Sequence, residues 1–101
     1  VHRGAVLRVG DLEIDTAHRT ATRDGAALAL TPREWSLLET LARHEGRPVA
    51  RETILSRVWA DDGRTASNVV DVVINHLRRK IGSDWIKNVR GVGYKLVEVA
   101  G

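Results

Sequence analysis

A well-formed helix start divides the sequence into two parts with different patterns. Thr31 can cap the helix, Pro32 suits its first position because its fixed φ matches helical backbone, and Glu34 completes a capping box. Apolar residues then recur at helical spacing until Gly46 and Pro48, which end the helix. A helical region that follows a first third of short β-prone segments predicts an α+β fold.

The first 30 residues predict a small antiparallel sheet. Short β-prone segments alternate with turn residues, and Asp24-Gly25 is a tight-hairpin signal because Gly accepts a positive φ. The expected strands are Val6–Val9, Leu12–Asp15, Arg19–Arg23 and Ala27–Leu30. No catalytic or ligand-binding pattern falls within them, so we expect this part to be a structural platform.

Two further helices and a C-terminal hairpin are expected after the first helix. Apolar periodicity predicts a second helix over residues 51–59 and a third over residues 68–81, which Gly82 ends. The hairpin strands are expected at residues 85–90 and 94–99. The predicted order is therefore ββββ-α-(β)-α-α-ββ.

The third helix has one apolar face and one polar face. At about 100° per residue, its larger aliphatic side chains fall within about 60° of Val70. The opposite side carries Asn68, Val72, Asn75, His76 and Arg79. Amide, guanidinium and small aliphatic groups are those that contact base edges in the major groove of DNA. Base-reading is therefore predicted for Val72, Asn75, His76 and Arg79; the alternative is an ordinary solvent-facing helix side.

The net charge of +3 conceals an uneven distribution. Residues 1–63 hold nine arginines against ten acidic residues, whereas residues 64–95 hold seven basic residues against two acidic ones. A basic C-terminal third is typical of a protein that binds a polyanion such as nucleic acid. The alternative is a solvated surface that happens to be rich in Lys and Arg.

The second and third helices form a helix-turn-helix arrangement with an unusually long connection over residues 60–66. That length and the trailing hairpin favour a winged form. Arg90, beside the hairpin turn, is the natural probe of a narrow and electronegative minor groove. Tyr94 either hydrogen-bonds a phosphate or packs on the sheet, and Lys87 and Lys95 are either phosphate contacts or strand-edge charges.

Residues 5–98 resemble the C-terminal effector domain of OmpR/PhoB-type two-component response regulators. The motifs that carry the resemblance are Leu30-Thr-Pro-Arg-Glu-Trp-Ser-Leu-Leu38, Val49-Ala-Arg-Glu52, Val58-Trp59, Asn68-Val-Val-Asp-Val72, Leu77-Arg-Arg-Lys-Ile81 and Val89-Arg-Gly-Val-Gly-Tyr94. The resemblance implies one winged-helix domain over residues 1–101, with residues 1–4 as the remnant of a linker from an upstream receiver domain. It also implies a homodimer that forms on direct-repeat DNA half-sites when the receiver is phosphorylated.

The resemblance also implies which residues contact the partners. The third helix would enter the major groove, and the wing over residues 86–97 would reach the minor groove. The residues expected at the DNA backbone or minor groove are Trp59, Arg64, Thr65, Asn68, Arg78, Lys87, Asn88, Arg90, Tyr94 and Lys95. The loop expected to contact RNA polymerase contains Asp61, Asp62, Gly63 and Arg64. Asn75-His76 replaces a pair that is often basic in the family, so base preference does not carry over.

Other classes of function find less support in the sequence. Cysteine is absent, the four histidines never fall at helical metal-binding spacing, and no phosphate-binding glycine loop occurs. We therefore expect neither an enzyme nor a bound cofactor or metal. No apolar run approaches the ~20 residues of a membrane span. The absence of cysteine is compatible with a reducing compartment, and we expect a cytoplasmic protein. A winged helix used only for protein contact remains the alternative, although the basic C-terminal third disfavours it.

Overall fold

Seven strands and four helical segments make up the part of the chain that the computed structural model describes, residues 6–61 and 68–99. In chain order they are β1 (Val6–Val9), β2 (Leu12–Asp15), β3 (Thr20–Arg23), β4 (Ala26–Ala27), α1 (Pro32–Arg43), β5 (Val49–Ala50), α2 (Arg51–Val58), α3 (Asn68–Ile81), the short 3-10 helix η1 (Ser83–Trp85), β6 (Ile86–Val89) and β7 (Gly93–Leu96). This is the winged helix-turn-helix fold predicted from the sequence.

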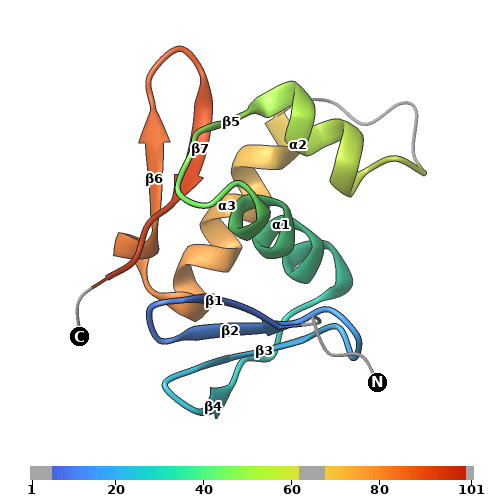
Figure 1. Ribbon diagram of the computed structural model, residues 1–101. Helices are drawn as coiled ribbons and strands as arrows, with labels where there is room; N and C mark the ends of the chain where they lie inside the picture. The colour runs from blue at the N-terminus through green and yellow to red at the C-terminus, as the bar shows by residue number, and fades with distance from the viewer. Residues whose placement is uncertain (1–5, 62–67, 100–101) are drawn as a thin grey trace.

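Two antiparallel sheets lie at opposite ends of the helices. The N-terminal sheet has the strand order β1-β2-β3-β4, and the C-terminal sheet has the order β5-β7-β6. Figure 1 shows the N-terminal sheet beneath α1, while the β6–β7 hairpin rises beside α2 at the other end. The hairpin tip is therefore free to contact a partner that the N-terminal sheet does not reach.

The start of α1 forms as predicted. The Thr31 hydroxyl accepts a hydrogen bond from the Glu34 backbone N–H at 3.2 Å, and the Glu34 carboxylate accepts one from the Thr31 N–H at 3.0 Å. Both bonds of the capping box are present, which satisfies two N–H groups that the helix itself cannot pair. By contrast, Ala50 gives α2 no side-chain cap.

One hydrophobic core joins both sheets to the three α-helices. Its largest fully buried side chains are Trp85, Leu12, Ile14, Leu37, Leu38, Leu41, Ile54, Ile74, Leu77, Ile81, Ile86 and Leu96. They come from β2, α1, α2, α3, η1, β6 and β7, so the helix-turn-helix and the hairpin share one packed interior. Moving the hairpin relative to α3 would therefore require repacking of this core.

Several strands are shorter than predicted. β4 covers only Ala26–Ala27, because the Leu30 N–H bonds the Leu28 carbonyl and turns the chain toward α1. Trp85 belongs to η1 rather than to the first hairpin strand, since Gly82, with φ of 114°, redirects the chain before it. None of the helices among residues 6–61 and 68–99 is long and apolar enough to cross a membrane.

Candidate nucleic-acid interface

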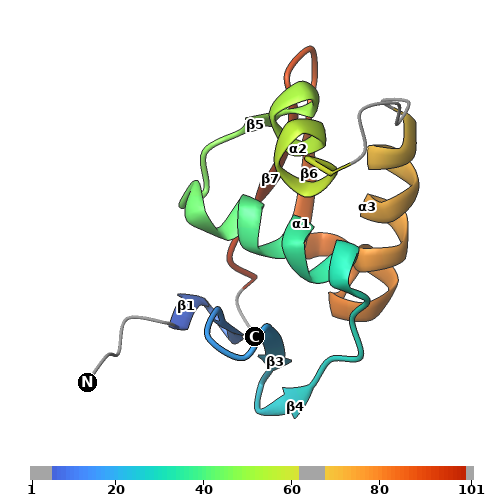
Figure 2. The same ribbon diagram turned by 90° about the vertical axis from the view of Figure 1, so that its right-hand side faces the viewer.

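The two faces of α3 are divided as the helical arithmetic predicts. Val70, Ile74, Leu77 and Ile81 are all fully buried, while the opposite side is exposed. The exposed residues on that side are Asn68, Val72, Asn75, His76 and Arg79. Figure 2 shows α3 running along an outer side of the molecule, with α1 packed on its inner side. The predicted base-reading side chains are thus available to a partner.

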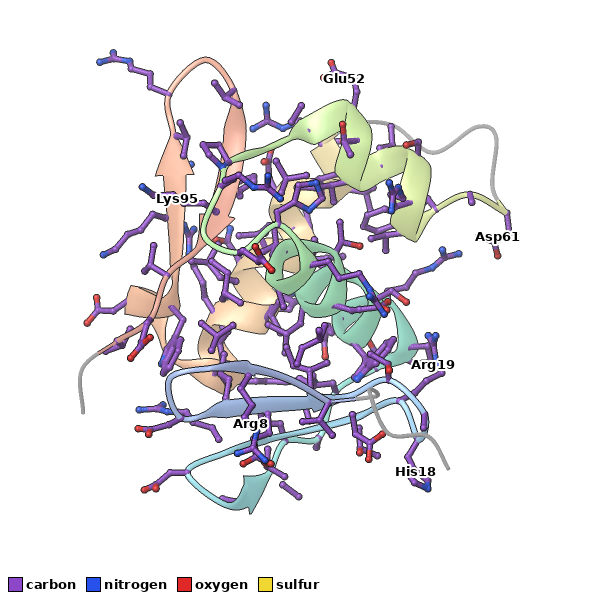
Figure 3. All side chains as sticks on the ribbon, viewed as in Figure 1. Arg8, His18, Arg19, Glu52, Asp61 and Lys95 are labelled. Carbon is purple, nitrogen blue, oxygen red and sulfur yellow. The ribbon has the colours of Figure 1, made fainter. Side chains whose placement is uncertain are left out.

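The β6–β7 hairpin supplies a second exposed surface beside α3. Arg90 and Val92 are exposed at its tip, where Gly91, with φ of 77°, forms the turn. Lys87 and Asn88 are exposed on β6, and Lys95, labelled in Figure 3, is half-buried on β7. The tip therefore presents one guanidinium group and one aliphatic side chain to a partner.

Arg78 joins α3 to the hairpin. Its Nε and Nη2 atoms donate to the Ile86 carbonyl at 3.2 and 2.8 Å, and Nη2 also donates to Asn88 Oδ1 at 2.7 Å. Its Nη1 atom donates to Asn75 Oδ1 at 3.4 Å. The sequence predicted a DNA-backbone contact for Arg78, which remains a prediction. What the structure adds is an internal link between two parts of the candidate interface.

A second cluster fixes the first turn of α3. Arg51 Nη2 lies 2.9 Å from Asp71 Oδ1, and the Tyr94 hydroxyl donates to the same carboxylate. The guanidinium carbons of Arg51 and Arg78 both lie 5.7 Å from the centroid of the Tyr94 ring. Sequence reasoning missed this cluster, because its members lie far apart in the chain.

The pKa values in this cluster move in the directions that preserve it. The hydrogen bond from Tyr94, and then the Arg51 guanidinium, hold the pKa of Asp71 below its ordinary value despite partial burial. Burial, followed by the nearby Asp71 carboxylate, raises the pKa of Tyr94 above its ordinary value. At neutral pH the carboxylate therefore stays ionised and the phenol stays protonated, which are the forms that this hydrogen bond requires.

Two predicted DNA-backbone contacts lie mostly inside the protein. Trp59 is 7% exposed and Tyr94 is 4% exposed, and both belong to the core. The Arg33 guanidinium lies 5.6 Å from the Trp59 ring centroid. Any DNA contact by these two aromatic residues must use their few exposed atoms, and both contacts remain predictions.

An ion pair between Lys80, which is exposed, and Glu34, which is buried, anchors the last turn of α3 to the start of α1. Lys80 Nζ lies 2.6 Å from Glu34 Oε1 and 2.7 Å from the Ala29 carbonyl oxygen. Burial raises the pKa of Glu34, but the Lys80 ammonium and the Thr31 N–H outweigh it, so that this pKa lies below its ordinary value. Sequence analysis treated Lys80 only as part of a basic run, and nothing in the local pattern separates it from its neighbours.

The predicted polymerase-contact loop is described only in part. Asp61 is exposed and pairs with Arg33, whose Nη1 atom lies 3.0 Å from Asp61 Oδ1. Asp62, Gly63, Arg64 and Thr65 lie outside the described residues, as do residues 1–4. Within the described ranges no group of three or more His, Cys, Asp or Glu side chains could hold a metal ion.

Comparison with known proteins identifies the family. Residues 25–96 match the family described as "Transcriptional regulatory protein, C terminal". The chain belongs to this family. These OmpR/PhoB-type domains are DNA-binding domains of transcriptional regulators and not enzymes. The family assignment agrees with the resemblance and with the winged-helix architecture.

Individual members of the family match over almost the whole chain. Transcriptional regulatory protein QseB of Escherichia coli O157:H7 is 45% identical over 92 residues, which cover 91% of this chain and 42% of QseB. The DNA-binding domain of CpxR from E. coli is 35% identical with a TM-score of 0.82, covering 94% of this chain and 98% of that one. The chain spans about two fifths of the length of the curated relatives that it matches.

A further member was solved with nucleic acid. The Klebsiella pneumoniae RstA DNA-binding domain, in complex with the RstA box, is 29% identical to this chain with a TM-score of 0.80. The match covers 91% of this chain and 96% of that domain.

Proposed function

We propose that this domain binds double-stranded DNA sequence-specifically, as the effector domain of a two-component transcriptional response regulator. In this proposal α3 lies in the major groove and the β6–β7 hairpin acts as a wing at the minor groove. The observation that carries it is the exposed amide, imidazole and guanidinium face of α3, held by Arg78 beside the exposed Arg90 hairpin.

The exposed side chains fall into two groups by the part of DNA that they can contact. On α3, Val72, Asn75, His76 and Arg79 would supply selectivity, because their functional groups match base edges. The residues proposed to contact phosphates or the minor groove are Trp59, Arg64, Thr65, Asn68, Arg78, Lys87, Asn88, Arg90, Tyr94 and Lys95. Phosphate contacts would supply most of the affinity and make it fall with rising salt concentration. The RstA complex with its box supports this mode of use for a domain of the same fold.

We extend the proposal to a longer protein of which this domain is one part, since the chain spans about two fifths of its curated relatives. In this proposal an upstream receiver domain would supply phosphorylation-dependent homodimerisation on direct repeats. The loop that begins at Asp61 would contact RNA polymerase. A protein of this kind acts on chromosomal DNA, so the proposal places it in the cytoplasm.

Selection of bound duplexes from a random pool tests the proposed function. We expect enriched sequences with a defined core, repeated in tandem when two domains bind together. A pool that shows no enrichment would contradict DNA recognition and would favour a winged helix used only for protein contact.

We expect Arg90→Ala to weaken binding to the selected duplex by about 1–3 kcal/mol, because the wing loses its charged tip. The slope of log affinity against log salt concentration should also fall by about one. A mobility-shift titration at several salt concentrations measures both. Arg8→Ala is the matched control, since Arg8 is exposed on β1 at the other end of the molecule (Figure 3). Equal affinities for the Arg90 variant and the unaltered domain would remove Arg90 from the interface.

We expect Asn75→Ala to relax sequence choice more than it lowers affinity for unrelated duplexes. Asn75 is exposed on the outer face of α3, so that its amide is available to base edges rather than to the core. The comparison uses the selected duplex and a scrambled duplex of equal length. Equal losses on both would argue for a backbone contact instead.

A further inference from the structure

The Arg78 guanidinium is surrounded by neutral oxygen atoms. It donates to the Ile86 carbonyl, to Asn88 Oδ1 and to Asn75 Oδ1, at distances between 2.7 and 3.4 Å. Every hydrogen bond that it makes to residues 6–61 and 68–99 ends on such an oxygen. The positive charge therefore fixes the orientation of polar groups instead of neutralising a carboxylate.

The contact determines which way each amide group is turned. An asparagine side chain can exchange its oxygen and its NH2 group by rotating through half a turn, and shape alone rarely decides between the two. A guanidinium group has only hydrogen-bond donors. An asparagine NH2 group turned toward it would place two donors together with no acceptor between them. Arg78 thus selects the carbonyl side of both Asn75 and Asn88, and both NH2 groups are left to donate elsewhere.

We propose that Arg78 is a positioning residue that determines base specificity by making Asn75 a donor to the major groove. This inference rests on the proposed function. The bidentate pairing of asparagine with adenine needs the carbonyl oxygen as acceptor and the NH2 group as donor together. With its carbonyl oxygen held by Arg78, Asn75 is suited to a base edge that offers acceptors. Guanine offers two acceptors, N7 and O6, and thymine offers O4. Adenine offers N7 beside an amino donor that would face the Asn75 NH2 group, and cytosine offers an amino donor at that edge.

The geometry extends the same reasoning to the wing. Asn88 lies on β6, and its carbonyl oxygen accepts from the same Nη2 atom that holds the Ile86 carbonyl. Asn88 is exposed, and its NH2 group suits a phosphate oxygen, which is an acceptor. A single guanidinium therefore sets a base-reading amide on α3 and a backbone-contacting amide on the wing.

Duplex selection with the unaltered domain and three variants tests the proposal. The position that Asn75 reads is the one at which Asn75→Ala abolishes base preference. At that position we expect the unaltered domain to enrich guanine or thymine, and a single change to adenine to lower affinity about fivefold or more. Arg78→Lys keeps the charge but offers one ammonium in place of the fork, so it cannot hold both amides. We expect this variant to accept adenine at that position, so that its affinities for the selected duplex and for the duplex with adenine become similar.

Each result bears on a different statement. Enrichment of adenine by the unaltered domain, or an unchanged preference in Arg78→Lys, would overturn the role of Arg78 while leaving DNA recognition intact. Absence of any enriched sequence would overturn the proposed function and the base preference with it. Arg8→Lys, the same chemical change far from α3, should alter neither result. If Arg78→Lys does not fold by circular dichroism, the adenine substitution with the unaltered domain alone decides the outcome.

Discussion

Gly93→Ala is expected to lower the free energy of unfolding by about 3 kcal/mol or more, and the melting temperature by about 12 °C or more. Gly93 is buried at the point where β7 pairs with β5 on one side and with β6 on the other. A Cβ atom here would overlap the carbonyl oxygen of Val49 and lie 3.0 Å from the backbone nitrogen of Arg51. Because these are backbone atoms, no side-chain rotation relieves the clash. Thermal unfolding followed by circular dichroism measures the effect.

The neighbouring turn supplies the matched control. Gly91 lies in the same hairpin with φ of 77°, and a Cβ atom there would meet nothing within 4 Å. Gly91→Ala therefore tests backbone strain without a steric clash. We expect it to lower the free energy of unfolding by about 1–2 kcal/mol. If Gly93→Ala were no more destabilising than Gly91→Ala, the close approach of β5 and β7 would not be the reason for glycine at this position.

The same close approach matters for binding. β5 leads directly into α2, and the Arg51 N–H bonds the Val92 carbonyl in the hairpin. Arg51 in turn pairs with Asp71 in the first turn of α3. Forcing β7 away from β5 would thus shift the β6–β7 hairpin relative to α3. We therefore expect the folded fraction of the Gly93→Ala protein to bind DNA weakly if the proposed function holds.

The local part of this fold could be predicted from the sequence. Thr31 and Glu34 cap α1 through contacts within one turn, and the aliphatic residues of α3 repeat at helical spacing, so both follow from neighbouring residues alone. The predicted ends of the strands were less accurate. Trp85 has the composition of a strand residue, but a positive φ at Gly82 places it in a 3-10 helix instead.

The roles of the basic residues at the end of α3 could not be predicted from the sequence. The three basic residues Arg78, Arg79 and Lys80 are consecutive, yet they lie in different surroundings. At about 100° per residue, Arg78 and Lys80 fall about 80° to either side of Val70, at the two borders of the buried face, and Arg79 points away from it. Which border residue finds a partner depends on β6 and on α1, elements that are distant in sequence.

Aromatic residues show the same limit of sequence reasoning. A DNA-backbone contact was predicted for Trp59 from its position in the family motifs and for Tyr94 from its hydroxyl group, which can hydrogen-bond a phosphate. Their rings are large apolar surfaces that gain free energy by burial, and the core contains both. The sequence left packing of Tyr94 on the sheet as one of two alternatives. Only the fold showed that its hydroxyl group reaches Asp71.

The second large effect is expected from Lys80→Met, which should destabilise the domain by about 3 kcal/mol at pH 7. Glu34 is only 5% exposed, and without Lys80 its carboxylate keeps the Thr31 N–H but loses its cation. Arg79→Met, which removes the same charge from the exposed face one residue away, should change stability by no more than about 0.5 kcal/mol. Urea titrations of both variants make the comparison.

The pH dependence separates this ion pair from simple packing. In the unaltered domain the pKa of Glu34 is lowered by folding, so its stabilising contribution is present above the ordinary carboxyl pKa and is lost as pH falls through the folded value. In Lys80→Met no ammonium opposes the effect of burial, so the pKa of Glu34 should rise. The loss of unfolding free energy relative to the unaltered domain should therefore be largest at neutral pH and smaller near pH 4. Adding Glu34→Gln to Lys80→Met removes the unpaired charge while keeping an acceptor for the Thr31 N–H, and should restore stability at pH 7. If the double variant were no more stable than Lys80→Met at pH 7, the anchoring of α3 to α1 would depend on packing of the lysine stem and not on its charge.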